Sequence, residues 1–241
     1  MKHFLRKNKE KVELPSSAFV YNSSHISGKR GRLGEDMRYL VFYAVDMLLW
    51  SAALILVLIL VSRISGHRPS KAQAFWKLVL ALYLAAVYNV AGAPELPYIY
   101  PRLNINLIPL WDITSGVKAY LINSGLNILL FIPLGFILPL LWKEFRSRRA
   151  MCFTGFLLSL GIELAQLLNY RVSDVDDLIM NTLGTFLGYE LLIRLSRRKK
   201  GLLIQEQADG RKIFLVILGV VVLVMFALRP YITRAVSNIM F

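Results

Sequence analysis

Six apolar blocks, most of them close to the length that crosses a lipid bilayer, divide this chain of 241 residues. The hydrocarbon core of a bilayer is roughly 30 Å thick, so a helix needs about 20 apolar residues to span it. The mean hydropathy of +0.53 and the hydrophobic content of 56% exceed those of an ordinary soluble domain. The blocks lie at residues 40–61, 74–91, 124–142, 150–169, 177–195 and 212–228. The sequence therefore predicts an all-α, polytopic transmembrane helix bundle with about six spans, or five if one weak block is not a span.

Composition divides the chain into four regions. Residues 1–38 are polar, basic and rich in Ser, Gly and Pro, which predicts a flexible basic N-terminal tail. Residues 40–91 are expected to form two accessory transmembrane helices, residues 100–195 a central transmembrane domain, and residues 212–241 a final helix with a C-terminal tail. Arg229 and Pro230 are expected to end that last helix sharply, because proline removes a backbone donor.

The net charge of +14 is explained by a membrane rather than by nucleic acid. Basic residues cluster beside the apolar blocks, in the loops at 62–74, 143–149 and 196–211, where the positive-inside rule and anionic head groups account for them. Six spans place these loops on one side and the loops at 92–123 and 170–176 outside, although the basic N-terminal tail argues for the reverse. We therefore expect a multi-pass protein of the cell membrane that contacts membrane lipids and no nucleic acid. The single cysteine and the lack of nucleotide-binding motifs predict no disulfide, metal or cofactor.

A polar stripe runs along the fourth apolar block. Gly155, Ser159, Glu163, Gln166 and Tyr170 follow one another at spacings of 4, 4, 3 and 4 residues, which places them on one face of a helix. Such a stripe faces protein or water and not lipid, and an ionisable group within a span marks a functional site by default. Glu163 should therefore be paired, or neutral with a raised pKa. A functional glutamate and a glutamate that only hydrogen-bonds the bundle together remain equally open.

The fifth block repeats this pattern. Asp177, Asn181, Gly184 and Gly188 share a helix face, and the two glycines form a close-packing motif. Either Asp174 or Asp176 could cap the start of this helix. One carboxylate is enough for a cap, so the additional acids near Arg171 predict an ionic cluster at the membrane edge.

The third block is interrupted by Pro133 and Pro139. Pro133 is expected to free a backbone carbonyl and to bend the helix, while Gly135 allows close packing at the bend. Asn127 lies on the same face as Gly135 and is expected to point toward the same interior as Glu163. The bend could serve packing only or could shape a cavity.

These motifs, taken in order, resemble the VanZ family. The matching segments are Asn127–Phe136, Glu163–Gln166, Arg171 with Asp174 and Asp177, and Asn181–Gly188, preceded by Asn106–Pro109. The resemblance covers about residues 100–195 and implies a Gram-positive-type cell envelope and an association with resistance to glycopeptide antibiotics, teicoplanin in particular. The expected functional polar core comprises Asn127, Glu163, Gln166, Arg171, Asp174, Asp177 and Asn181, with Pro133, Gly135, Gly184 and Gly188 in structural roles.

Three functions fit this pattern. The first is a non-enzymatic protein that binds a lipid-linked cell-wall precursor or a lipoglycopeptide at the outer leaflet, with Arg171 contacting phosphate. The second is an intramembrane enzyme acting on a lipid, in which Glu163 and Asp177 divide general acid and base roles or carboxylates hold a divalent ion. The third is a transporter or flippase driven by protonation of Glu163 near the membrane midplane. We favour the first, because the chain shows no conspicuous nucleophile and no inverted repeat.

Overall fold

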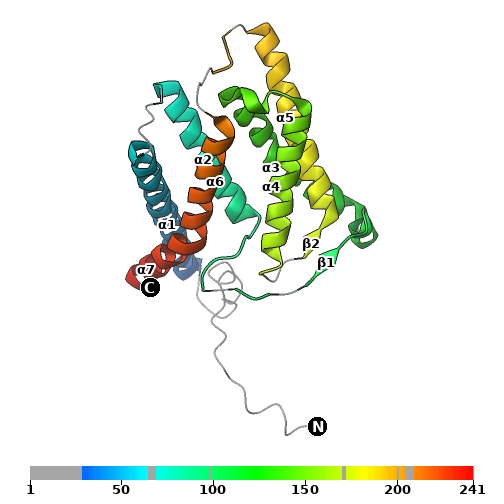
Figure 1. The fold of residues 1–241 in the computed structure, drawn as a ribbon. Helices are drawn as coiled ribbons and strands as arrows, with labels where there is room; N and C mark the ends of the chain where they lie inside the picture. The colour runs from blue at the N-terminus through cyan, green and yellow to red at the C-terminus, as the bar shows by residue number, and fades with distance from the viewer. Residues whose placement is uncertain are drawn as a thin grey trace.

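The protein is a bundle of helices arranged in two groups, as seen in a computed structural model (Figure 1). The structure describes residues 29–64, 69–97, 99–101, 103–169, 172–199, 201–204 and 209–240. The first group contains α1 (Lys29–Ile64), α2 (Lys71–Val90), α6 (Gly210–Leu223) and α7 (Arg229–Met240). The second group contains α3 (Val117–Leu141), α4 (Arg148–Gln166) and α5 (Val175–Arg198). The predicted all-α bundle is confirmed.

Among the described residues, four helical segments are long and apolar enough to cross a membrane. They are Met37–Leu60, Lys71–Val90, Val117–Leu141 and Gly210–Met240. The helices α4 and α5 are not among them, because both carry charged residues near their ends and polar residues where they face each other. A bundle with these segments is a membrane protein, and α4 and α5, which are not among them, pack against each other in the second group.

The ends of the bundle differ from the sequence prediction at two places. Residues 29–38, expected in the flexible tail, are the beginning of α1, and the rest of that tail lies outside the described residues. Pro230 does not end the last helix, which continues through a π-helical turn, Val224–Leu228, into α7. In that turn the Arg229 N–H donates to the Val224 carbonyl, five residues back instead of four. The hydrogen-bond register of the helix has therefore already shifted before Pro230, which has no N–H to donate.

Glycines bring α3 and α5 into backbone contact. A Cβ atom added to Gly135 would lie 1.9 Å from the Thr185 carbonyl oxygen, and one added to Gly184 would lie 2.3 Å from that of Ile128. A Cβ on Gly188 would lie 2.0 Å from the Ile132 carbonyl oxygen. These distances exclude any side chain, which is the geometry expected where small residues pack transmembrane helices. The three glycines therefore set the separation of α3 and α5.

The prolines of α3 do not break it. The helix runs without interruption through Pro133 and Pro139, so the expected interruption is wrong. The hydroxyl of Tyr83 on α2 donates to the Leu130 carbonyl at 2.8 Å, next to the carbonyl that Pro133 leaves without its usual donor. Neighbouring helices commonly supply such donors to proline-containing spans. Tight packing on both sides thus holds α3 in a helical path.

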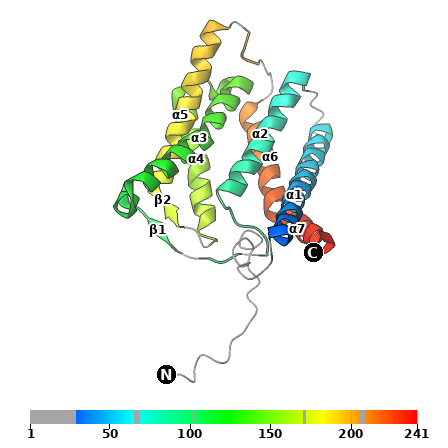
Figure 2. The same ribbon diagram turned by 180° about the vertical axis from the view of Figure 1, so that it is seen from behind.

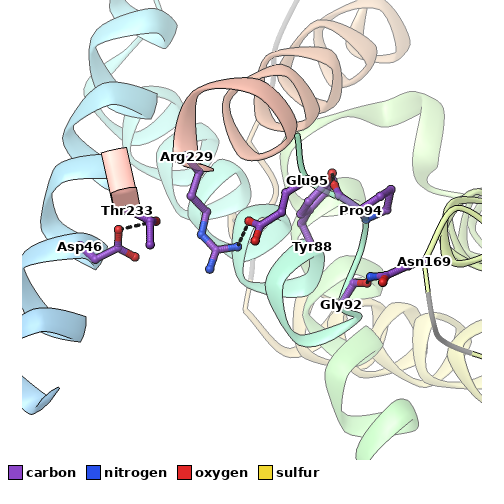
Figure 3. Close-up of polar contacts among 8 residues, drawn as sticks. All are labelled: Asp46, Tyr88, Gly92, Pro94, Glu95, Asn169, Arg229 and Thr233. Carbon is purple, nitrogen blue, oxygen red and sulfur yellow. Dashed lines mark hydrogen bonds and ion pairs between the residues drawn. The ribbon is translucent and has the colours of Figure 1, made fainter. Parts of the chain in front are cut away.

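The turn at residues 91–96, which we call the tether turn, joins the two groups (Figure 3). At the end of α4, the Gln166 side-chain amide donates to the Ala91 carbonyl at 2.8 Å, and in the turn after α4 the Asn169 amide donates to the Gly92 carbonyl at 2.9 Å. From the last helix, Arg229 forms an ion pair with Glu95 at 3.4 Å. The tether turn is therefore bonded to both groups at the same end of the bundle.

The glycine contacts lead to a prediction about stability. Gly188→Ala should force α3 and α5 apart and lower the free energy of unfolding by about 1–3 kcal/mol, the usual range for overpacking. The measurement is the thermal unfolding temperature of the purified protein in detergent. The control is Gly125→Ala on α3, where the added Cβ meets no atom within 4 Å. Equal unfolding temperatures for the two variants would contradict the assigned role of the α3–α5 contact.

Candidate functional site

The polar residues of the second group gather at one end of the bundle, where α4 ends and α5 begins. A short parallel ladder lies at this end, formed by β1 (Ile105–Asn106) and β2 (Ser173–Asp174) (Figure 2). It brings the segment before α3 against the start of α5, because Asn106 pairs with Asp174. Loop backbone, helix ends and carboxylates meet at this end. We call the polar side chains here, those of Asn127, Glu163, Asp174, Asp176 and Asp177, the acidic cluster.

Two aspartates of the acidic cluster fix the loop that precedes α3. Asp174 is the N-cap of α5, accepting from the Asp176 backbone N–H at 2.9 Å, and its other oxygen accepts from the Asn106 side-chain amide at 3.1 Å. Asp176, which is buried, accepts from the Leu110 N–H at 2.8 Å. Leu110 has a left-handed backbone with φ of 66°, which costs a non-glycine residue energy that the surroundings must offset. Asp176 thus holds a strained turn in place.

Glu163 is buried in the last turn of α4 and points into the acidic cluster. Its Oε2 atom accepts from the Asp174 N–H at 2.8 Å, and the Ser173 side chain bonds the same carboxylate. The Asn127 amide of α3 donates to the Asp177 carboxylate of α5. The structure therefore brings Asn127 to Asp177 and Glu163 to Asp174, and all four belong to the polar core expected from the sequence. Glu163 lies at the end of α4, a helix that is not among the candidate membrane spans, and the transporter hypothesis stays a prediction.

The other predicted residues lie elsewhere. Asn181 is deeper between α4 and α5, where its amide donates to the Ser159 hydroxyl at 2.9 Å. Gln166 points to the tether turn and not to the acidic cluster. Both keep one buried oxygen without a hydrogen-bond partner among the described residues. Arg171 lies outside the described residues.

The acidic cluster is rich in hydrogen-bond acceptors. Within the described ranges, Glu163, Asp174 and Asp176 form no ion pair with a lysine or arginine. No three side chains of the His, Cys, Asp or Glu type come close enough to hold a metal in the part of the chain that the structure describes. These residues therefore offer no set of metal ligands for the enzyme hypothesis in which carboxylates hold a divalent ion. Chemically, the cluster is suited to groups that donate hydrogen bonds or carry positive charge.

A large apolar groove separates the two groups on the other side of α4. Its volume is about 760 Å³. Representative lining residues are Leu84 and Tyr88 of α2, Leu157 and Gly161 of α4, and Leu218 and Val222 of α6. The sequence prediction missed this groove, because each of its walls reads as an ordinary lipid-facing helix surface. It also missed the polar contacts of Glu95 with Arg229 and of Asp46 with Thr233, which join residues far apart in the sequence (Figure 3).

Apolar helices of spanning length, polar residues sequestered between α4 and α5, and a groove between two helix groups define a helical membrane protein. Comparison with known proteins gives the family. The profile of the VanZ/LLP1 family matches residues 47–197, and the chain belongs to this family. Protein VanZ of Enterococcus faecium is 30% identical over 158 residues, which cover 61% of this chain and 89% of that protein. No solved structure matches the chain significantly.

Removing the cap of α5 tests how the acidic cluster is built. Asp174→Ala should cost about 1 kcal/mol at the helix start and also release Asn106, so amide hydrogen exchange should accelerate at residues 105–110. Asp209→Ala removes an equivalent N-cap, that of α6, and should accelerate exchange only there. Unchanged exchange at residues 105–110 in the Asp174 variant would show that another contact holds this loop.

Proposed function

We propose that this protein is a multi-pass protein of the cell envelope that binds an amphiphilic ligand at the outer leaflet and thereby lowers susceptibility to teicoplanin. The ligand classes are a lipoglycopeptide and a lipid-linked cell-wall precursor, both of which join an apolar tail to a large polar part. One observation carries the proposal: the apolar groove and the acidic cluster lie on two faces of the last turns of α4. Family membership supports the resistance role, and the polar and apolar surfaces support the ligand class.

The groove is suited to an apolar tail. Its volume falls within the range of roughly 300–1,000 Å³ typical of small-molecule sites. Gly161 contributes to the width, because a Cβ there would meet no atom within 4 Å. A tail arriving from water gains about 0.8 kcal/mol for each buried methylene, but it gains much the same in the bilayer itself. The groove therefore supplies a place and an orientation for the tail, and selectivity must come from the polar part.

The end of α4 determines where the polar part of the ligand would bind. Ala165 and Leu168 line the groove, while Glu163, within the same two turns, points into the acidic cluster. Carboxylate oxygens favour partners that donate hydrogen bonds, such as the amine, amide and hydroxyl groups of a glycosylated peptide. A diphosphate would be repelled by these carboxylates. The described charges thus favour a lipoglycopeptide over a diphosphate-linked lipid.

The orientation follows from the charges at the two ends of the bundle. The end of α5 and the start of α6 lie at the end opposite to β1 and β2 (Figure 1). Arg197 and Arg198 close α5, and Arg211 and Lys212 open α6. By the positive-inside rule, this basic end lies in the cytoplasm. The acidic cluster and the residue 170–176 loop, at the opposite end, then lie at the outer face. An extracellular antibiotic would meet the acidic cluster first.

Filling the groove tests the proposal. Gly161→Phe should occupy the groove, whereas Gly219→Phe places the same side chain at an exposed glycine of α6 that does not line it. In a sensitive Gram-positive host at matched membrane levels, wild type and Gly219→Phe should raise the inhibitory concentration of teicoplanin at least fourfold, and Gly161→Phe should not. A glycopeptide without an acyl chain serves as the control drug and should show no such difference.

The outcomes separate the parts of the proposal. Equal protection by both phenylalanine variants would reject the groove as the tail site. Protection against both drugs would reject the role of the acyl chain. Glu163→Gln, which removes the carboxylate charge and keeps the side-chain shape, should reduce protection if the acidic cluster binds the polar part of the ligand. Failure of the wild type to protect would reject the resistance role.

A further inference from the structure

A second, basic pocket lies at the end of the bundle opposite to the acidic cluster. It has a volume of about 300 Å³ and is lined by Arg146, Ser196, Arg197, Lys199 and residues 201–203. The lining comes from the loop between α3 and α4, the end of α5 and the loop that leads to α6. The proposed amphiphile site does not use this pocket.

Arg146 is fixed in place at the wall of this pocket. Its Nε donates to the Pro139 carbonyl at 2.9 Å, and its Nη2 donates to the Ile204 carbonyl at 2.7 Å. The Pro139 carbonyl is one of the last carbonyls of α3, which have no partner within the helix and carry its negative dipole end. The Arg146 backbone carbonyl in turn accepts from the Tyr189 hydroxyl at 3.2 Å. A rigid cation, rather than a mobile surface chain, thus forms one wall.

The positive charge of the pocket is not neutralised from within. Three of the lining side chains are cations, and none is an acid. Arg146 bonds only backbone carbonyls among the described residues, and burial lowers the pKa of its guanidinium, the sign of a charged group with incomplete compensation. Glu144 acts electrostatically on Arg146 and Glu190 on Arg197, but Glu144 lines the apolar groove and neither acid lines this pocket. An anion in the pocket would supply the missing countercharge.

We propose that the basic pocket binds the phosphate of an anionic membrane lipid. Arginine and lysine together favour phosphate binding. The planar guanidinium of arginine can donate two parallel hydrogen bonds to phosphate oxygens, and the ammonium of lysine attracts phosphate as a compact positive charge. Half-buried Leu202 and Leu203 line the same pocket, so an apolar surface lies beside the cations, as a lipid requires and a free phosphate ion does not. Basic pockets between helix ends on the cytoplasmic side are typical sites for such head groups.

Binding at this pocket would stabilise the contact between the two helix groups. The Ile204 N–H also donates to the Leu140 carbonyl at 3.0 Å, so the loop before α6 is bonded to the end of α3 at the pocket wall. A phosphate that bridges Arg146 to Arg197 and Lys199 would link the loop before α4 to the end of α5, where the loop toward α6 begins. The tether turn joins the groups at one end of the bundle, and the lipid would reinforce their junction at the other.

The test compares two double variants that each remove two positive charges at the same end of the bundle. Arg197→Gln with Lys199→Gln removes the exposed cations of the pocket, and Lys143→Gln with Arg149→Gln removes two exposed cations outside it. Phosphatidylglycerol is titrated into the detergent-purified full chain, with phosphatidylcholine and inorganic phosphate in parallel, and the thermal unfolding temperature is followed. A ligand that binds only the folded state raises this temperature.

We expect phosphatidylglycerol alone to stabilise the wild type and the Lys143/Arg149 variant, and its apparent affinity to fall at least tenfold in the Arg197/Lys199 variant. Equal losses in both double variants would overturn the proposal in favour of general attraction to a basic surface. Equal stabilisation by phosphatidylcholine, or stabilisation by inorganic phosphate, would also overturn it. Gly161→Phe, which fills the apolar groove, should leave the response to phosphatidylglycerol unchanged, so this result stands or falls separately from the proposed function.

Discussion

The backbone contact between α3 and α5 is the constraint on which the candidate site depends. Gly184 meets Ile128 and Gly188 meets Ile132, so successive turns of two helices running in the same direction are held in register. This register brings Asn127 to Asp177 at the end of the pair where α5 begins. Without the close approach, the amide and the carboxylate would face each other across the width of intervening side chains. The glycines therefore position the polar residues as well as pack the helices.

Much of this arrangement could be predicted from the sequence, because it follows from helical periodicity. The positions of the helices, the polar face of α4 and the shared face of Asp177 and Gly184 all repeat at three to four residues, which a linear pattern reveals. The family resemblance added the order of the motifs. The meeting of Glu163 with the start of α5 was within reach as well, since only a short loop connects the two helices.

The rest depends on contacts that no local pattern contains. The groove is formed by three helices from different parts of the chain, and the ion pair of Glu95 with Arg229 joins residues 134 positions apart. Pro230 predicts a helix end by local rules, but the π turn before it and the bond between Thr233 and Asp46 on α1 keep the helix going. Gln166 shares a helical face with Glu163, yet small differences in direction give the two side chains different partners.

The shape of the groove also determines how a ligand can reach it. Several of its residues, including Phe153, Leu157 and Leu215, are exposed apolar side chains on helix surfaces that would face lipid tails. The tether turn is bonded to both helix groups at one end, and the Arg146 contacts join them at the other. For the proposed amphiphile, entry would therefore be sideways from the bilayer and not along the bundle axis. A molecule that reaches the groove in this way is already concentrated in two dimensions, so its occupancy depends on its density in the leaflet rather than on its concentration in solution.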